Sequence, residues 1–347
     1  MKFSRERTEA IRSYILEKID SGTENVVQHV SEALDVDSST VHRYIEKLIS
    51  EGFIEREKRG QYKLKESSWH YMLHRSEGDL DDDISPYGRF LKDHIKSLPQ
   101  KVQNIWAYVF SEMINNIIDH SEAENASLTI VNNTLKTTVI LVDDGVGIFQ
   151  KIKNYFDLPT LEDAIAELFK GKVTTDTVNH SGEGIFFSSR LMDEFYIVSS
   201  GRIFSCNHFD EENVYRLTGR DFPGTAVIMT LSNQSGKRSQ DIFNQFADVD
   251  GGFTKTWIPL KNMFDSPPVS RSQAKRLCSH LDQFQEVTLD FAELTWMGQG
   301  FAHQLFQVFQ AQHPDVRLRP VNMEEGVQKM YNHVVNTDRL SGECEQI

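Results

Sequence analysis

"WAYVFSEMINNIIDHSEA", residues 106–123, is the stretch that decides the fold of the middle of the chain. Its apolar residues recur at the spacing of a helix, and its polar residues Glu112, Asn116 and Asp119 follow one another at i, i+4 and i+7. That spacing places all three on one face of a helix, so that they project into the same region. By itself the spacing is equally typical of a solvated helix face.

Two strand-like runs, "ASLTIVNN" and "LKTTVILV", follow this helix and end in "DDGVGIF", residues 143–149. The second strand delivers a carboxylate at Asp143. Gly145 and Gly147 then allow a sharp turn and a close approach of a ligand that side chains would block.

Two further turns carry the same kind of signal. Gly182 and Gly184 in "VNHSGEGIFF" open another predicted helix, whose free backbone N–H groups favour phosphate oxygens. Gly224 and Thr225 in "FPGTAVIMTL" precede a terminal strand. In this order and at this spacing, the four segments resemble the GHKL ATPases, the class of gyrase, Hsp90, histidine kinases and MutL. The resemblance covers about residues 85–262.

This resemblance implies an ATP site with Mg²⁺ as its metal. Asn116 would coordinate the metal through its side-chain oxygen, and Glu112 would orient or deprotonate the attacking group. Asp143 would accept a hydrogen bond from the adenine amino group. Asp119 would complete the cofactor-binding face of its helix, and the neighbouring His120 would cap the helix end or hold a carboxylate.

The glycine turns take the remaining roles that the resemblance implies. Gly145 and Gly147 would let the nucleotide approach closely, Gly182 and Gly184 would line the phosphates, and Thr225 would lie under the adenine. Residues 171–181 would form a mobile lid.

The first 66 residues predict three short amphipathic helices and a basic two-stranded hairpin. This pattern resembles the winged helix-turn-helix regulators, which implies DNA binding through residues 38–65. The residues expected to reach the DNA are Ser39, Thr40, His42 and Arg43 at a major groove, and Arg59 in the wing. A net charge of −14 argues against general coating of nucleic acid but does not exclude such a local module. The alternative is that this unit mediates dimerisation or another protein contact.

Residues 67–84 end in an acidic, turn-rich run and predict a linker. Residues 263–347 alternate helical and apolar strand runs. Through "SRSQAKRL", "LDF" and "GQGFAHQLF" they resemble the STAS-like domain DUF4325. Related anti-anti-sigma proteins carry a phosphoaccepting serine after the central strand, where this chain has Met297, Gly298, Gln299 and Gly300. A protein-contact surface is therefore the expected role, and Ser270 is expected to cap a helix.

The expected architecture is a multidomain α+β protein. It consists of a winged helix-turn-helix, a Bergerat-type α/β sandwich with helices on one face of a mixed sheet, and a small STAS-like α/β domain. No stretch reaches the length of uninterrupted apolar residues that a membrane helix needs, so we expect a cytoplasmic protein without a membrane partner.

The expected function is that of a regulator, a homodimer in which ATP binding or slow hydrolysis controls DNA binding. Two alternatives stay open. One is a serine/threonine kinase or anti-sigma-like partner-switching factor, because "SEMINNIIDHSE" resembles the helix of anti-sigma-factor serine kinases. The other is an ATP-gated dimeric clamp or defence component. Histidine autokinase activity is not expected, because no upstream helix pair offers a phosphoaccepting His followed by Glu and Pro.

Overall fold

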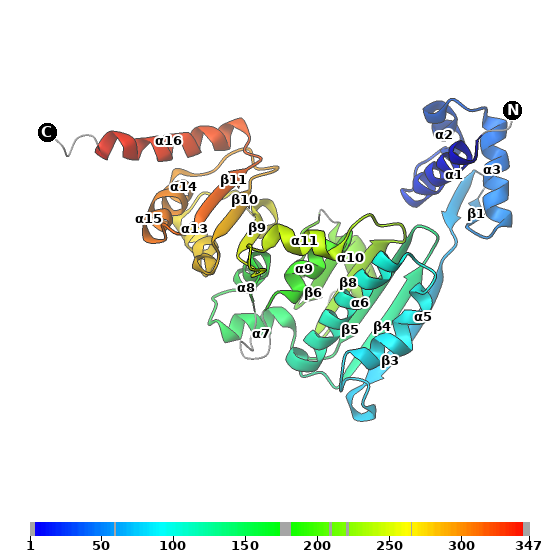
Figure 1. Ribbon diagram of the computed structural model, residues 1–347, viewed down its shortest axis with the longest axis horizontal. Helices are drawn as coiled ribbons and strands as arrows, with labels where there is room; N and C mark the ends of the chain where they lie inside the picture. The colour runs from blue at the N-terminus through cyan, green and yellow to red at the C-terminus, as the bar shows by residue number, and fades with distance from the viewer. Residues whose placement is uncertain are drawn as a thin grey trace.

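The computed structural model describes residues 4–58, 60–173, 182–207, 210–219, 222–264 and 266–342. A central unit of one sheet and several helices carries a small helical unit at one end and a second sheet-and-helix unit at the other (Figure 1). None of the helices in these ranges is both long and apolar enough to cross a membrane.

The N-terminal unit consists of three helices and a hairpin, as the sequence predicts. Buried Ile11, Val30 and Ile45 come from the three different helices and meet in one core. The following hairpin pairs its two strands antiparallel. The elements are α1 (Arg5–Asp20), α2 (Val26–Leu34), α3 (Ser38–Ser50), β1 (Ile54–Lys58) and β2 (Gln61–Leu64).

The central unit is built on a six-stranded sheet of order β3-β4-β5-β8-β6-β7. Every pairing in it is antiparallel, so the expected mixed sheet is wrong. Tight hairpins join β4 to β5 and β6 to β7, and β8 enters between β5 and β6 antiparallel to both. The strands are β3 (Ser67–His74), β4 (Asn125–Asn132), β5 (Lys136–Asp143), β6 (Glu194–Ser199), β7 (Arg202–Phe204) and β8 (Thr225–Ser232).

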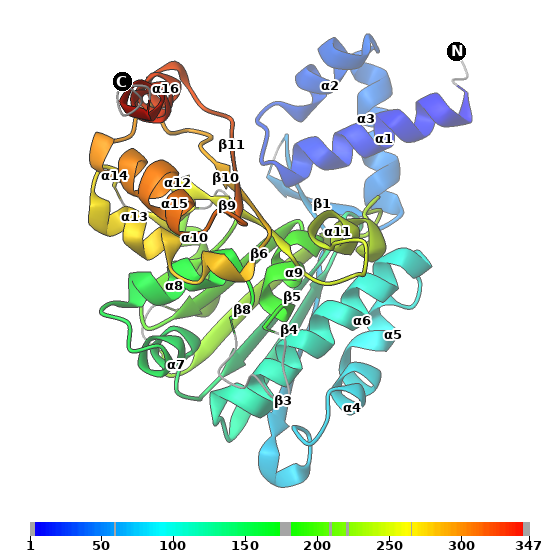
Figure 2. The ribbon, with the colours of Figure 1, turned by 60° about the vertical axis from the view of Figure 1, so that its left-hand side comes forward.

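Helices cover both faces of this sheet, and the expectation of helices on one face only is therefore also wrong. On one face α6 (Gln100–Asn115) and α9 (Gly184–Leu191) pack over strands whose apolar residues alternate (Figure 2). On the other face α10 (Glu211–Thr218) packs Val214 and Tyr215 over a second apolar cluster that includes Ile140 and Ile228. Strands β5 and β8 are apolar on both sides, and burying both sides requires a second layer.

The other elements of the central unit connect the strands or cover the first face. They are η1 (Arg75–Glu77), α4 (Ile84–Pro86), η2 (Tyr87–Leu91), α5 (Lys92–Ile95), α6 (Gln100–Asn115), η3 (Asn116–Ser121), α7 (Ile148–Tyr155), α8 (Leu161–Lys170), α9 (Gly184–Leu191) and α11 (Ser239–Phe246).

Strand β3 lies within the segment 67–84, which was expected to be a linker. It pairs with β4 over its whole length, from Ser67 opposite Asn132 to His74 opposite Asn125. The alternation of Trp69, Tyr71 and Leu73 with polar residues is the sequence signal for this strand. The acidic run that follows it masked that signal.

The C-terminal unit has a three-stranded parallel sheet of order β11-β10-β9, which agrees with a STAS-like arrangement. Its first strand, β9, precedes the expected boundary at residue 262, so this unit begins at Lys255 instead. The elements are β9 (Lys255–Pro259), α12 (Leu260–Met263), α13 (Arg271–Cys278), η4 (Leu281–Gln283), β10 (Glu286–Asp290), α14 (Gln299–His303), η5 (Gln304–Phe309), α15 (Gln310–Gln312), β11 (Arg317–Val321) and α16 (Glu325–Gly342).

Candidate functional site

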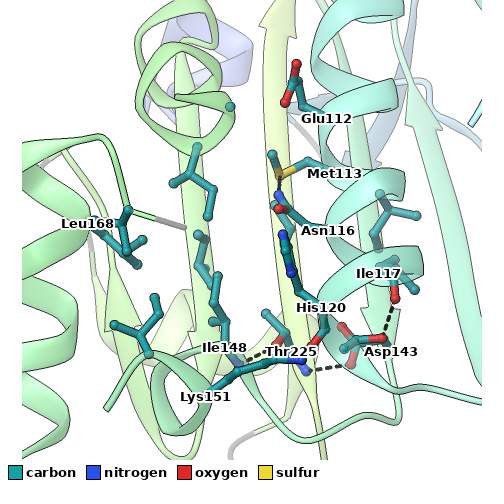
Figure 3. Close-up of a pocket in the computed structure, with 18 of the residues that line it drawn as sticks. Glu112, Met113, Asn116, Ile117, His120, Asp143, Ile148, Lys151, Leu168 and Thr225 are labelled. Carbon is teal, nitrogen blue, oxygen red and sulfur yellow. Dashed lines mark hydrogen bonds between the residues drawn. The ribbon is translucent and has the colours of Figure 1, made fainter. Parts of the chain in front are cut away.

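Helix α6 presents polar residues to a cavity between itself and the sheet. The helix follows Pro99 and buries its apolar residues at helical spacing, Trp106, Val109 and Met113 among them. Glu112 and Asn116 lie one turn apart and both line the cavity (Figure 3). The expected pairing of these two residues is therefore present.

Asp119 does not share this cavity, contrary to the prediction. The helix widens into the π-helical turn η3 at Asn116, and i→i+5 bonding rotates the following residues relative to an α-helix. As a result His120 lines the cavity below Asn116, whereas Asp119 lines a separate depression beside α7. His120 thus lines the cavity, a position that its expected role at the helix end did not include.

Asp143, at the end of β5, is the buried carboxylate of the cavity, with 5% of its surface exposed. Its Oδ1 accepts hydrogen bonds from the backbone N–H groups of Gly145, at 2.9 Å, and Thr225, at 3.3 Å. Burial raises the Asp143 pKa to about 6, and these two hydrogen bonds oppose that rise. The carboxylate is held by backbone donors and has no cation among the partners that set its pKa.

Thr225 ties this carboxylate to the start of α7. Its Oγ1 accepts a hydrogen bond from the N–H of Ile148 at 3.0 Å. The preceding Gly224 has φ +84°, and a Cβ there would lie 2.1 Å from the carbonyl oxygen of Asp143. Only glycine therefore lets strands β5 and β8 meet this closely at the cavity floor.

Gly184 begins α9 directly against Glu112. A Cβ on Gly184 would lie 2.1 Å from Glu112 Oε2, so the missing side chain makes room for the carboxylate. Tyr108, one turn before Glu112 on α6, is hydrogen-bonded to it, and burial together with this neighbour raises the Tyr108 pKa. The phenol therefore stays protonated and helps to hold Glu112 at the N-terminus of α9.

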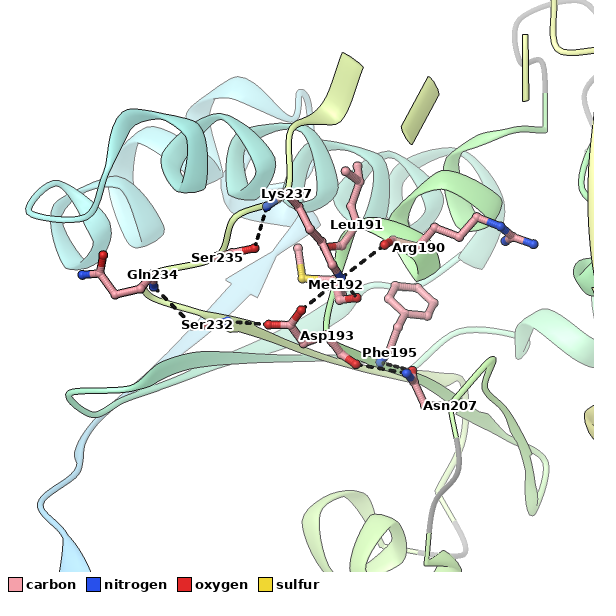
Figure 4. Close-up of polar contacts among 10 residues, drawn as sticks. All are labelled: Arg190, Leu191, Met192, Asp193, Phe195, Asn207, Ser232, Gln234, Ser235 and Lys237. Carbon is pink, nitrogen blue, oxygen red and sulfur yellow. Dashed lines mark hydrogen bonds and ion pairs between the residues drawn. The ribbon is translucent and has the colours of Figure 1, made fainter. Parts of the chain in front are cut away.

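The opposite end of α9 is fixed by Lys237, which sequence reasoning did not single out. Its Nζ donates to the carbonyl oxygens of Leu191, at 3.1 Å, and Met192, at 2.6 Å, and forms an ion pair with Asp193 at 3.0 Å (Figure 4). A cation at the C-terminus of a helix satisfies its last carbonyl groups and complements its dipole. Lys237 therefore helps to fix the helix whose other end faces the cavity.

The cavity brings together six predicted site residues and encloses them in apolar walls. Leu168 of α8 lies opposite α6, and Ile148 and Lys151 of α7 close the lower side (Figure 3). Lys151 was not predicted; its Nζ donates to His120 O at 2.6 Å and pairs with Glu122 at 3.2 Å. The predicted residues that line the cavity are Glu112, Asn116, Asp143, Gly182, Gly184 and Thr225.

Gly145 and Gly147 do not line the cavity but build its floor. Gly145 donates its N–H to Asp143, and Gly147 immediately precedes α7. Of the predicted lid, residues 174–181 lie outside the described residues. The two residues that flank this gap are joined, since the N–H of Val173 donates to Gly182 O at 3.2 Å.

A protein-only metal site is not present in the described ranges, where no three His, Cys, Asp or Glu side chains gather in a way that could hold an ion. Any metal at Asn116 would therefore take most of its ligands from water and from a bound molecule. Mg²⁺ commonly binds in this way, through one or two protein oxygens plus phosphates.

The N-terminal unit exposes part of the predicted DNA-binding surface. Ser39, His42 and Arg43 are exposed on α3, and Thr40 is half-buried. Arg59 lies outside the described residues. Three other cations of this segment are paired with carboxylates of the same unit, Lys47 with Glu51, Arg56 with Glu46 and Lys63 with Glu55. These carboxylates partly neutralise the surface that was predicted to be basic, and Arg43 is not among the paired cations.

The expected cap of α13 is confirmed. Ser270 Oγ accepts from Gln273 N at 3.1 Å, and Gln273 Oε1 accepts from Ser270 N at 2.9 Å, which forms a capping box. Gly298 begins the next helix, where a Cβ would lie 2.4 Å from the carbonyl oxygen of Val269. The loop before α14 is therefore a tightly packed turn, and its residues 297–300 contain no hydroxyl side chain.

Comparison with known proteins identifies one part of the chain. Residues 273–328 match the family described as a STAS-like domain of unknown function (DUF4325). This region runs from α13 through β10 and β11 into α16. No curated protein matches the chain.

Proposed function

We propose that the central unit binds ATP as a GHKL-type domain, with adenine on Asp143. The observation that carries this proposal is the burial of that carboxylate and its hydrogen bonding to the backbone. Oδ1 already accepts two backbone N–H groups, and the side chain borders a cavity with apolar walls. A buried carboxylate in such a place favours a ligand that donates a hydrogen bond from a flat apolar ring, as the adenine amino group does.

The remaining cavity residues suit the phosphates and their metal. Glu112 and Asn116 offer oxygen atoms on successive turns of α6, and the N-terminus of α9 at Gly184 offers backbone N–H groups. Asn116 would hold Mg²⁺, which would neutralise phosphate charge. Glu112, placed beside Gly184, would orient the attacking group, and hydrolysis would be slow.

In this scheme of regulation the N-terminal unit is a winged helix that binds DNA, and DNA binding is the activity that ATP controls. Its three helices and antiparallel hairpin have the right order, and α3 exposes Ser39, His42 and Arg43. Nucleotide in the central unit would change the affinity of this unit for DNA. Such coupling requires that ATP bind two states of the protein with different affinity.

The decisive experiment compares ATP with inosine triphosphate, which differs at the purine 6-position and keeps the same phosphates. Calorimetry in Mg²⁺ buffer should show tighter binding of ATP by the wild-type protein. The Asp143→Asn variant should lose this preference, while the exposed Asp250→Asn variant keeps it. Equal affinity of the wild-type protein for both nucleotides would contradict the placement of adenine on Asp143.

A second experiment separates hydrolysis from phosphate transfer. Protein is incubated with Mg²⁺ and γ-labelled ATP beside Glu112→Ala and Asn116→Ala variants. Free labelled phosphate that both substitutions abolish supports the ATPase, and label retained on protein supports the kinase alternative. Binding without turnover would mean that ATP acts only as a ligand.

A further inference from the structure

Helix α8 lies between the candidate nucleotide cavity and the C-terminal unit. All of its residues from Asp163 to Lys170 are buried, including three charged side chains. Such charges are rarely buried unless they are paired. Their partners show what this helix is built to contact.

Lys170, at the end of α8, is anchored in the C-terminal unit. Its Nζ is 2.9 Å from the carbonyl oxygens of both Arg276 and Ser279, at the C-terminal end of α13, and 2.6 Å from Glu167 Oε1. The other oxygen of Glu167, Oε2, lies 3.0 Å from His280 Nδ1. This group of side chains is an interdomain cluster whose donors and acceptors are matched across the boundary.

An ion pair also crosses the same boundary at the start of α8. Asp163, 6% exposed, lies 3.2 Å from the guanidinium of Arg276, whose side chain is 44% exposed. Beyond the end of the helix, Lys172 Nζ donates to Gln283 O at 3.0 Å. Both ends of α8 are therefore held by the C-terminal unit.

The same short segment forms part of the candidate nucleotide cavity. Leu168 and Val173 line the cavity. The N–H of Val173 also donates to the carbonyl oxygen of Gly182, another residue that lines the cavity. A shift of α8 would move Leu168 and Val173 together, because Leu168 lies on the same helix between Glu167 and Lys170, which contact the C-terminal unit.

We propose that Asp163, Glu167 and Lys170 are positioning residues for the nucleotide site. Through these three residues the C-terminal unit sets the position of α8, whose Leu168 forms part of the cavity wall. This proposal rests on the proposed function of the central unit. Its consequence is that whatever binds or displaces the C-terminal unit changes nucleotide affinity, and nucleotide in turn changes how that unit is held.

The test uses Arg276→Gln in the full chain, with Lys275→Gln as its control. Both replace an exposed cation of α13, and Arg276 is the one that forms the ion pair with α8. We expect Arg276→Gln to weaken ATP binding by about fivefold or more, within the usual range for coupled sites. Asp163→Asn should have a similar effect that does not add to it in the double variant. The control should bind like the wild-type protein.

Hydrogen exchange without nucleotide gives an independent readout. Peptides that cover residues 161–173 should exchange faster in Arg276→Gln than in Lys275→Gln. If the wild-type protein binds no nucleotide, the proposed function fails, but faster exchange still supports the positioning of α8. Unchanged ATP affinity in a nucleotide-binding protein overturns the inference, even where melting temperature falls. Unchanged exchange in a protein without nucleotide binding overturns it as well.

Discussion

At the scale of single residues, the burial of Asp143 is a cost for folding that the proposed contact with adenine would offset. Its carboxylate is buried, and its pKa is raised to about 6 mainly by desolvation. A rise from 3.8 to about 6 corresponds to roughly 3 kcal/mol between the two protonation states. The free protein therefore carries a buried group whose charged form is stabilised when a hydrogen-bond donor reaches it.

Replacing Asp143 by asparagine should make the protein more stable at neutral pH while it abolishes adenine selectivity. The folded protein binds more protons than the unfolded chain between about pH 4 and pH 6, so its stability falls as pH rises through this window. The asparagine side chain keeps an acceptor for the N–H groups of Gly145 and Thr225 but carries no charge. Denaturant unfolding at pH 7.5 should show a gain of roughly 1–3 kcal/mol, and a loss would contradict this account.

The preference for ATP over inosine triphosphate should itself depend on pH. In the proposed complex an ionised Asp143 would accept the amino hydrogen, and protonation below about pH 6 would weaken that acceptor. The ratio of the two affinities cancels the titration of the phosphates, which both nucleotides share. We expect the ratio to fall between about pH 7.5 and about pH 5 in the wild-type protein, measured by calorimetry. A ratio that does not change with pH would exclude Asp143 as the selecting group.

At the scale of secondary-structure elements, the site depends on where helices begin and end. Helix α6 changes into the wider turn η3 at Asn116, which brings His120 to the cavity and turns Asp119 away. Helix α9 begins at Gly184, where Glu112 occupies the space of a side chain, and Lys237 caps its other end. These contacts link two helices that are distant in sequence.

Gly184→Ala should disturb this junction. The added Cβ would meet the Glu112 carboxylate at 2.1 Å, so either α9 or Glu112 must move. Overpacking of this kind typically costs about 1–3 kcal/mol, and nucleotide affinity should fall by about tenfold or more. The matched control is Gly236→Ala, since a Cβ there would meet nothing within 4 Å and its φ is not positive. Thermal unfolding and nucleotide titration of both variants check this prediction. Equal stability and equal nucleotide affinity of the two variants would contradict it.

At the scale of the whole molecule, the central unit contacts the C-terminal unit through α8. The C-terminal unit is joined by buried polar contacts, whereas the N-terminal unit continues into edge strand β3 after β2. An ion pair between Lys136 and Asp20, 2.8 Å apart, also connects the N-terminal unit to the sheet. The central unit is thus joined to its two neighbours by different kinds of contact.

Arg43→Ala should weaken DNA binding if α3 contacts DNA. One lost phosphate contact should reduce the slope of log affinity against log salt by about one. Arg216→Ala removes an exposed arginine from the central unit and should leave DNA affinity unchanged. Fluorescence anisotropy with duplex DNA, with and without ATP, measures both effects. Binding by Arg43→Ala that matches the wild-type protein at every salt concentration would favour the protein-contact alternative.

Patterns within short stretches of the chain were enough to predict the local features of this protein. Hydrophobic periodicity predicted α6 and the N-terminal helices, and helical spacing placed Glu112 and Asn116 on one face of α6. The resemblance to GHKL ATPases added Asp143 and the glycine turns to the expected site. These features depend on short stretches of chain whose spacing is fixed by helix and strand geometry. The match of residues 273–328 agrees with the domain expected there.

Which segments share a sheet or a cavity, in contrast, became clear from the fold of the whole chain. Strand β3 was hidden because its weak alternation needs β4 as a partner, and β9 joined the C-terminal sheet by pairing with β10, which follows it in the chain. The position of Asp119 depended on a π-helical turn that periodicity does not reveal. The carbonyl partners of Lys170 on α13 lie 106 and 109 residues further along the chain, a separation that no local pattern records. Contacts between distant segments are set by packing of the whole chain, and this is the physical reason that sequence patterns alone did not place them.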